Sequence, residues 1–328
     1  MDKGPEAQLL KTAAVLIPPA EKIVITVITD NLADATRRDE RIATRPVRRT
    51  SNLDAAMHAE HGLSYHIETM VDGRSHACLF DFGADARGVL RNIDLLKIDF
   101  QKIDAIALSH DHWDHQSALI DILKAKREEI RKVIPFYVGQ GCFAGTYSRR
   151  PDGSIIRATE LKKHDVEQLG LVRIVEVTEP AQIIPGACLP GRIEQVTDYE
   201  KVAPTFLAKQ GGDYVQETFI GEQAVILHAK GRGLVVISGC AHRGIVNTVR
   251  QAQKITGITK VCAVVGGFHL TGAKTELIRR TIADIKALAP EYVIPTHCSG
   301  FETVMAFARE MPDEFLLNTA GTRYTIAA

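Results

Sequence analysis

Hydrophobic and polar positions follow different patterns in the two halves of the chain. In the first half, runs of β-branched and apolar residues predict strands over 23–29, 63–71, 76–82, 103–108 and 133–138, and helical periodicity predicts helices over 86–96 and 116–131. Asp72-Gly73 is typical of a hairpin turn between two of these strands. From residue 231 strands and helices alternate, with strands over 234–238, 261–265 and 292–295 and helices over 244–255, 273–288 and 301–310. The pattern predicts an α/β protein, strand-rich early and built of βα units late.

Two polar segments interrupt this pattern. Residues 32–60 are polar and rich in arginine, and residues 139–165 are rich in glycine and arginine. Surface loops of this kind commonly carry specificity. We therefore interpret both segments as insertions that form a lid, within a single domain spanning 1–328. A homodimer built on these insertions is compatible with the pattern, which does not itself define the oligomeric state.

The composition indicates a globular protein and argues against nucleic-acid and membrane partners. The chain has 328 residues, of which 45% are apolar and 24% charged, as in ordinary globular proteins. Lys+Arg and Asp+Glu each number 40, and this zero net charge argues against a nucleic-acid partner. Six cysteines without a C-x-x-C pair indicate a reducing compartment, and we expect the cytoplasm. No segment reaches the roughly 18 apolar residues of a membrane span, and the short run over 9–17 lacks the pattern of a signal peptide, so we expect no membrane partner.

A dense cluster of candidate metal ligands follows the strand predicted over 103–108: His110, His112, Asp114 and His115. Imidazole and carboxylate groups bind transition metals such as zinc, iron and nickel. Histidines two positions apart point the same way on an extended backbone, and the last two residues begin the next helix and can face a second ion. The competing interpretation is a polar loop in which Ser109 or Asp111 caps the helix and the histidines are solvated.

Further candidate ligands follow three successive strands of the second half. His242, His269 and His297 each come soon after a predicted strand. Strand ends are where a βα scaffold presents its site, so we expect these histidines to meet the first cluster. Cys240 either ligates as a thiolate or is a small buried residue in a tight turn.

These motifs resemble a known superfamily. H-x-H-x-D-H after a strand is similar to the signature of the metallo-β-lactamase fold superfamily, and Leu79-Phe-Asp-Phe-Gly83 resembles its early motif, with Asp81 as the buried supporting carboxylate. The motifs E-H-G-L-S, S-G-C-A-H-R-G, V-G-G-F-H-L and P-T-H-C-S-G resemble the subfamily named after 7,8-dihydropterin-6-ylmethyl-4-(β-D-ribofuranosyl)aminobenzene 5′-phosphate synthase. The resemblance covers roughly residues 60–300. It implies an αββα sandwich, with two mixed sheets face to face, helices outside, and metals where strand ends converge.

The sequence departs from the superfamily pattern in two places. The bridging carboxylate usually follows a strand as Gly-Asp, whereas this chain has Gly239-Cys240. The usual middle histidine precedes that carboxylate, but residues 221–224 read G-E-Q-A. His242 is therefore our candidate for the third ligand of the first metal, and the ligand set is expected to be asymmetric. His297 matches the late histidine of the superfamily, and His269 is either a ligand or an acid near the leaving group.

The implied mechanism uses one or two divalent ions, with zinc favoured and iron or manganese as alternatives. Two ions can share a hydroxide, lower its pKa towards neutrality and polarise the bond under attack. Asp111 is expected to orient water or to hydrogen-bond a ligand imidazole. For a phosphorylated substrate, we expect Arg243, Ser299 at the start of the terminal helix, and His61 to line the pocket.

The function favoured by these residues is a metal-dependent hydrolase or transferase acting on a phosphorylated, pterin-like small molecule. A nuclease or phosphodiesterase of the same fold is a second hypothesis, which the neutral charge disfavours. A metal-binding or ligand-sensing protein without turnover is a third, favoured by the absent middle histidine and bridging carboxylate.

Overall fold

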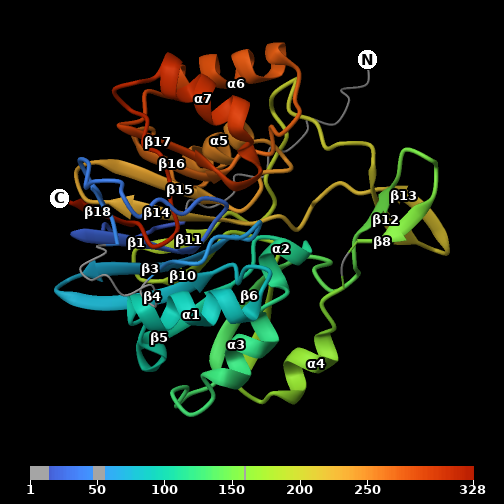
Figure 1. Cartoon of the computed structure of the whole chain (residues 1–328), viewed down its shortest axis with the longest axis horizontal. Helices are drawn as coiled ribbons and strands as arrows, with labels where there is room; N and C mark the ends of the chain where they lie inside the picture. Colours follow the sequence, from blue (N-terminus) through green and yellow to red (C-terminus); the bar gives the residue numbers. More distant parts are fainter. Residues whose placement is uncertain (1–14, 47–55, 159) are drawn as a thin grey trace, which may run out of the picture.

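Two β-sheets lie face to face in the computed structural model, which describes residues 15–46, 56–158 and 160–328 (Figure 1). The first sheet has eight strands. In spatial order they are β2 (Ala43–Thr44), β18 (Arg323–Ala327), β1 (Lys22–Thr29), β3 (Ser64–Val71), β4 (Arg74–Phe80), β5 (Ile103–Ala107), β6 (Ile134–Gly139) and β9 (Val172–Val177). The pairing is antiparallel from β2 to β4 and parallel from β4 to β9, so the sheet is mixed.

The second sheet has six strands and is also mixed. Its order is β10 (Ala181–Ile184), β11 (Ala187–Leu189), β14 (Ala224–Ala229), β15 (Gly233–Ser238), β16 (Val261–Gly267) and β17 (Tyr292–Thr296). The last three strands are parallel, because a helix connects each to the next. Parallel strands joined in this way all end at the same edge of the sheet, which is where their following loops meet.

Three separate hydrophobic cores define four layers. One core fills the space between the sheets and includes Ile25, Phe80 and Val235. A second core packs the first sheet against α1 (Ala86–Leu96), α3 (Leu119–Ala125) and α4 (Lys163–Gln168). A third packs the second sheet against α5 (Ile245–Thr256), α6 (Thr275–Leu288) and α7 (Phe301–Glu310). Figure 1 shows these helix groups on opposite sides of the sheets, and this arrangement confirms the predicted αββα sandwich.

Two differences between the observed and the predicted elements have a clear physical reason. The single helix predicted over 116–131 is instead a short α2 (Trp113–Gln116) followed by α3, which ends at Ala125. Residues 126–131 are K-R-E-E-I-R and have little apolar surface to bury, so the helix does not continue. Strand β18 was not predicted, and it depends on pairing with β1 and β2 at the edge of the first sheet.

A small four-stranded sheet stands away from the sandwich (Figure 1). Its strands, here called the arm sheet, are β13 (Asp213–Gln216), β12 (Phe206–Gln210), β7 (Tyr147–Arg149) and β8 (Ile155–Arg157). The segment predicted as an insertion over 139–165 thus supplies two of its strands. In the other predicted insertion, residues 43–44 form β2, and residues 47–55 lie outside the described residues.

The described helices include none that is both long and apolar enough to cross a bilayer.

Candidate metal centre

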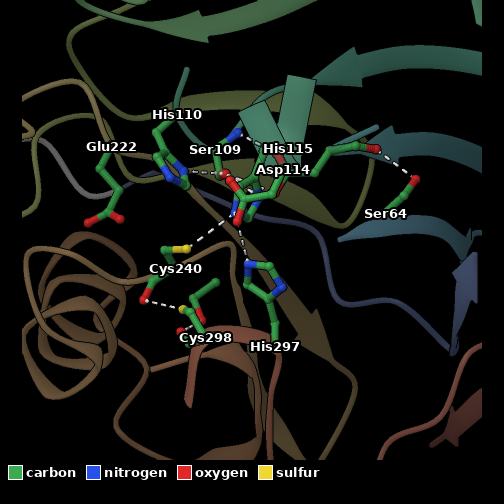
Figure 2. A network of polar contacts seen from close by, with 12 residues as sticks. Ser64, Ser109, His110, Asp114, His115, Glu222, Cys240, His297 and Cys298 are labelled. Atoms are coloured by element: carbon green, nitrogen blue, oxygen red, sulfur yellow. Dashed lines mark hydrogen bonds and ion pairs between the residues drawn. The ribbon is translucent and has the colours of Figure 1, made fainter. Parts of the chain in front are cut away.

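The predicted ligands come together where strands of both large sheets end. His110, His112, Asp114 and His115 follow β5 of the first sheet. Cys240 and His242 follow β15, His269 follows β16, and His297 follows β17 of the second sheet. Figure 2 shows Asp114 and His115 facing Cys240 and His297 across this edge. The centre therefore lies between the two halves of the sandwich, and each half contributes ligands.

One group consists of His110, His112 and His242, whose candidate ligand atoms lie within 4.8 Å of one another. The Nε2 atoms of His110 and His242 are 3.2 Å apart. Burial lowers the pKa of both imidazoles well below the ordinary value, so both rings are neutral. The buried Nε2 of His112 has no hydrogen-bond partner in the described part of the chain. Three converging imidazoles with an unpaired nitrogen fit a metal ion.

A second group consists of Asp114, His115, Cys240 and His297, again within 4.8 Å. Asp114 Oδ2 lies 3.1 Å from His297 Nε2, and His115 Nε2 lies 3.2 Å from Cys240 Sγ. Burial alone would raise the pKa of Asp114, but the nearby His115 and His297 hold it below its ordinary value. A carboxylate, a thiol and two imidazoles form a mixed donor set of the kind that zinc and other transition metals accept.

Cys240 lies at the junction of the two groups. It also falls within 4.8 Å of His242 and His269, so its sulfur lies close to members of both groups. This is the position at which the resemblance places a bridging carboxylate. His242 completes the first group, where the middle histidine is absent. His242 and Cys240, which the sequence analysis nominated for these two positions, therefore both lie within candidate ligand groups.

Asp81 orients His115, a member of the second group, through a buried hydrogen bond. Its fully buried carboxylate accepts hydrogen bonds from Ser109 N at 2.7 Å, Ser109 Oγ at 2.8 Å and His115 Nδ1 at 2.6 Å. A Cβ added at Gly239 would lie 2.2 Å from Ser109 Oγ, so the residue before Cys240 has to be glycine. The packing fixes the tautomer of His115 and leaves its Nε2 facing the centre.

The backbone is strained at several of these positions. Residues with a positive φ, outside glycine, include Asp81 at 61°, Ala241 at 56°, His269 at 48° and His297 at 52°. Such conformations are unfavourable for residues with a Cβ and persist where surrounding structure enforces them. Their clustering at one edge indicates that the fold aims these side chains at the cost of local strain.

Glu222 is a site residue that the sequence analysis did not identify. Its buried carboxylate accepts the backbone N–H groups of His242 at 2.7 Å and Arg243 at 2.8 Å. Burial raises its pKa to about 7, and these hydrogen bonds oppose the shift. The signal was present in the sequence, because Glu222 lies where the middle histidine was sought.

Two phenylalanines also went unnoticed in the sequence. Phe219 stacks on His242 with ring centroids 4.0 Å apart. The ring centroid of Phe206, from the arm sheet, lies 5.1 Å from the ring centroids of His112 and His242 and 5.7 Å from that of His269. Apolar rings over the imidazoles exclude water from one side of the centre.

The three residues expected to bind substrate lie in different surroundings. Arg243 is buried, and its guanidinium donates to the carbonyl oxygens of Ile193, at 2.6 Å, and Thr218. Ser299 is fully buried, and its Oγ accepts the N–H of Phe268 at 3.0 Å. Both side chains make their hydrogen bonds within the protein interior, and their contact with phosphate stays a prediction. His61 is half-exposed and lies at the solvent-facing side of the candidate ligands, with its Nε2 3.5 Å from Asp114 Oδ2.

The two predicted catalytic side chains line two different hollows beside the candidate ligands. Asp111 accepts a hydrogen bond from Thr146 Oγ1 at 2.8 Å and lines a hollow beside His110 and Glu222. Burial raises the pKa of Asp111 to about 7. His269 lines a second hollow beside His242.

Comparisons with known proteins agree with the motifs. No protein-family model matches the chain. The chain is 35% identical over 260 residues to the 7,8-dihydropterin-6-methyl-4-(beta-D-ribofuranosyl)-aminobenzene-5′-phosphate synthase of Methanocaldococcus jannaschii, covering 78% of this chain and 87% of that one. An uncharacterised protein of the same organism is 28% identical over 246 residues, covering 75% and 86%.

Solved structures show the same fold. A metal-dependent hydrolase of the β-lactamase superfamily superposes with a TM-score of 0.71 at 23% identity, covering 93% of this chain and 100% of that one. A metallo-β-lactamase fold protein of Bacillus subtilis superposes with a TM-score of 0.51 at 12% identity, covering 93% and 99%. The four layers, the motifs and the identity over most of both chains agree. The chain belongs to the metallo-β-lactamase fold superfamily and, within it, to the family of the 7,8-dihydropterin-6-methyl-4-(beta-D-ribofuranosyl)-aminobenzene-5′-phosphate synthase.

Proposed function

We propose that this protein is a metal-dependent hydrolase or transferase that acts on a phosphorylated small molecule with a pterin-like ring. The observation that carries the proposal is the pair of adjoining candidate ligand groups, one of which contains Cys240, with Cys240 also within 4.8 Å of His242 in the other. The substrate class follows the name of the Methanocaldococcus jannaschii relative.

The donor set favours one or two divalent ions at this edge. His110, His112 and His242 would hold one ion, and Asp114, His115 and His297 the other, with Cys240 between them. Imidazole and thiolate together suit zinc, with iron or manganese as alternatives. A bound ion of this kind supplies Lewis acidity, which polarises the bond under attack and activates water.

Two side chains of this protein assist the reaction, one by orienting water and the other by donating a proton. Asp111, in the hollow beside His110, orients the attacking water through its carboxylate. His269, in the hollow beside His242, donates a proton to the leaving group. Asp81 and Glu222 contact no substrate and instead hold His115 and the turn at His242 in place.

A non-catalytic sensor is less well supported than an enzyme. The hypothesis rested on the missing middle histidine and bridging carboxylate, and the candidate ligand groups that contain His242 and Cys240 support an enzyme instead. For cellular context, we propose the cytoplasm, because the six cysteines are all free thiols in a fold of this size. A homodimer is compatible with the exposed arm sheet.

Elemental analysis of protein purified without added metal tests the proposal. Wild type is expected to hold close to two ions per chain, and His112→Ala is expected to lose at least one of them. His164→Ala, on exposed α4, is the matched control and should retain the wild-type content. Metal-loaded wild type is then screened against phosphoesters. Wild type without metal, or His112→Ala with unchanged metal, contradicts the metal assignment, and a metal-loaded protein inactive on every phosphoester contradicts the reaction class.

A further inference from the structure

An exposed tryptophan lies at the rim of the metal centre. Trp113 is 46% exposed, although it stands between His112 and Asp114, which are 8% and 6% exposed. It begins α2, which in Figure 1 lies on the side of the sandwich nearest the arm sheet. A large apolar ring left in solvent within an otherwise buried turn marks a surface for contact with another molecule.

A second ring extends this surface towards the ligands. The centroid of His61 lies 5.9 Å from that of Trp113. On its other side His61 stacks on His297 at 4.8 Å, with an interplanar angle of 19°. The Asn31 side chain holds this pair, since Oδ1 lies 3.2 Å from His61 Nδ1 and Nδ2 donates to the carbonyl of His297 at 3.0 Å. His61 is therefore held beside Asp114 and His297, and the ring of Trp113 lies next to it.

We propose that Trp113 and His61 form a stacking subsite for a planar heteroaromatic ring in the substrate of the metal centre. This subsite rests on the function proposed above. Aromatic faces bind flat rings by offset stacking, and the indole offers the larger face. A ring lying on Trp113 has its substituent directed past His61 towards Asp114 and His297.

Binding of a flat and a non-flat probe tests the subsite. Protein purified with its metals is titrated with 7,8-dihydropterin and, separately, with ribose 5-phosphate, by calorimetry. Trp113→Ala should weaken binding of dihydropterin roughly tenfold, whereas Trp113→Phe should retain most of it. Ribose 5-phosphate binding should be the same in all variants. Because Trp113 is the only tryptophan, its fluorescence in wild type should also respond to dihydropterin.

Tyr214→Ala is the matched control, since Tyr214 is 41% exposed on the arm sheet and should leave dihydropterin binding unchanged. Three results overturn the subsite: unchanged dihydropterin affinity in Trp113→Ala, a reduced metal content in that variant, or a change in its oligomeric mass, which would show that a second copy covers the ring. If wild type holds metal and is active, but Trp113→Ala binds dihydropterin as tightly as wild type, the subsite is rejected and the proposed function stands. Trp113-dependent binding in a protein without phosphoester activity rejects the reaction alone.

Discussion

Asp81 binds one nitrogen of the His115 imidazole, and the other nitrogen faces the candidate metal centre. Its Nδ1–H donates to Asp81 Oδ2 at 2.6 Å, which leaves Nε2 3.2 Å from Cys240 Sγ. Both side chains are fully buried, so no water competes for the bond. The orientation of this ligand is consequently set by a residue 34 positions earlier in the chain.

Asp81→Asn should lower metal affinity without unfolding the protein. The amide offers one acceptor where the carboxylate offers two, so Ser109 or His115 loses its partner. We expect roughly a 10- to 100-fold weaker affinity for the second ion, measured by competition with a chromophoric chelator. Asp72→Asn, in the exposed hairpin turn, is the control. Equal affinities in Asp81→Asn and wild type would show that the contact does not orient His115.

Cys240→Asp should keep the metal content near that of wild type, because a carboxylate can occupy the bridging position. Cys240→Ala should lose at least one ion. The informative readout is optical: cobalt-loaded wild type should show a thiolate-to-cobalt charge-transfer band that is absent from Cys240→Asp. A band of equal strength in both proteins would exclude Cys240 as a ligand.

Glu222→Gln should weaken the His110–His112–His242 group more than the other. The amide can accept only one of the two N–H bonds that Glu222 now accepts from His242 and Arg243. The turn at Ala241, with φ of 56°, then loses part of what enforces it. A chelator titration should remove the first ion earlier than in wild type while the second is unchanged. Simultaneous loss of both ions would contradict this assignment.

Acid should destabilise the protein partly through His66, which lies in β3 away from the metal centre. Burial lowers its pKa to about 4, against an ordinary value of 6.5. The folded state thus favours neutral His66, and the stability it confers is complete above pH 6.5 and is lost as the pH falls towards 4. By pH 5 the loss should reach about 2 kcal/mol.

Urea unfolding at pH 7 and pH 5 measures this effect. His66→Gln should lose less stability between the two pH values than wild type, by about that amount. His76→Gln, in the more exposed β4, serves as the control. A wild-type difference equal to that of His66→Gln would assign the acid sensitivity to other groups.

Local patterns predicted most of the strands and helices and singled out the His110–His115 motif, because these features depend on neighbouring residues, whereas the four layers were predicted from the superfamily resemblance. The role of Glu222 was missed because it depends on a turn twenty positions later. The same limit applies to Arg243, whose guanidinium is committed to the Ile193 carbonyl. Strand β18 likewise becomes a strand only by lying against β1. Sequence periodicity does not show which residues distant in the chain come into contact in the fold.

The arm sheet links the two halves of the chain at a distance from the sandwich. Its strands β7 and β8 leave from the end of β6 in the first sheet, whereas β12 and β13 lie between β11 and β14 of the second. The pairing of Ser148 with Phe206 therefore closes a long loop that contains β9, β10 and β11. The same strand that forms this pair places the ring of Phe206 against His112 and His242. A change in the arm sheet therefore reaches two of the candidate ligands through a single aromatic ring.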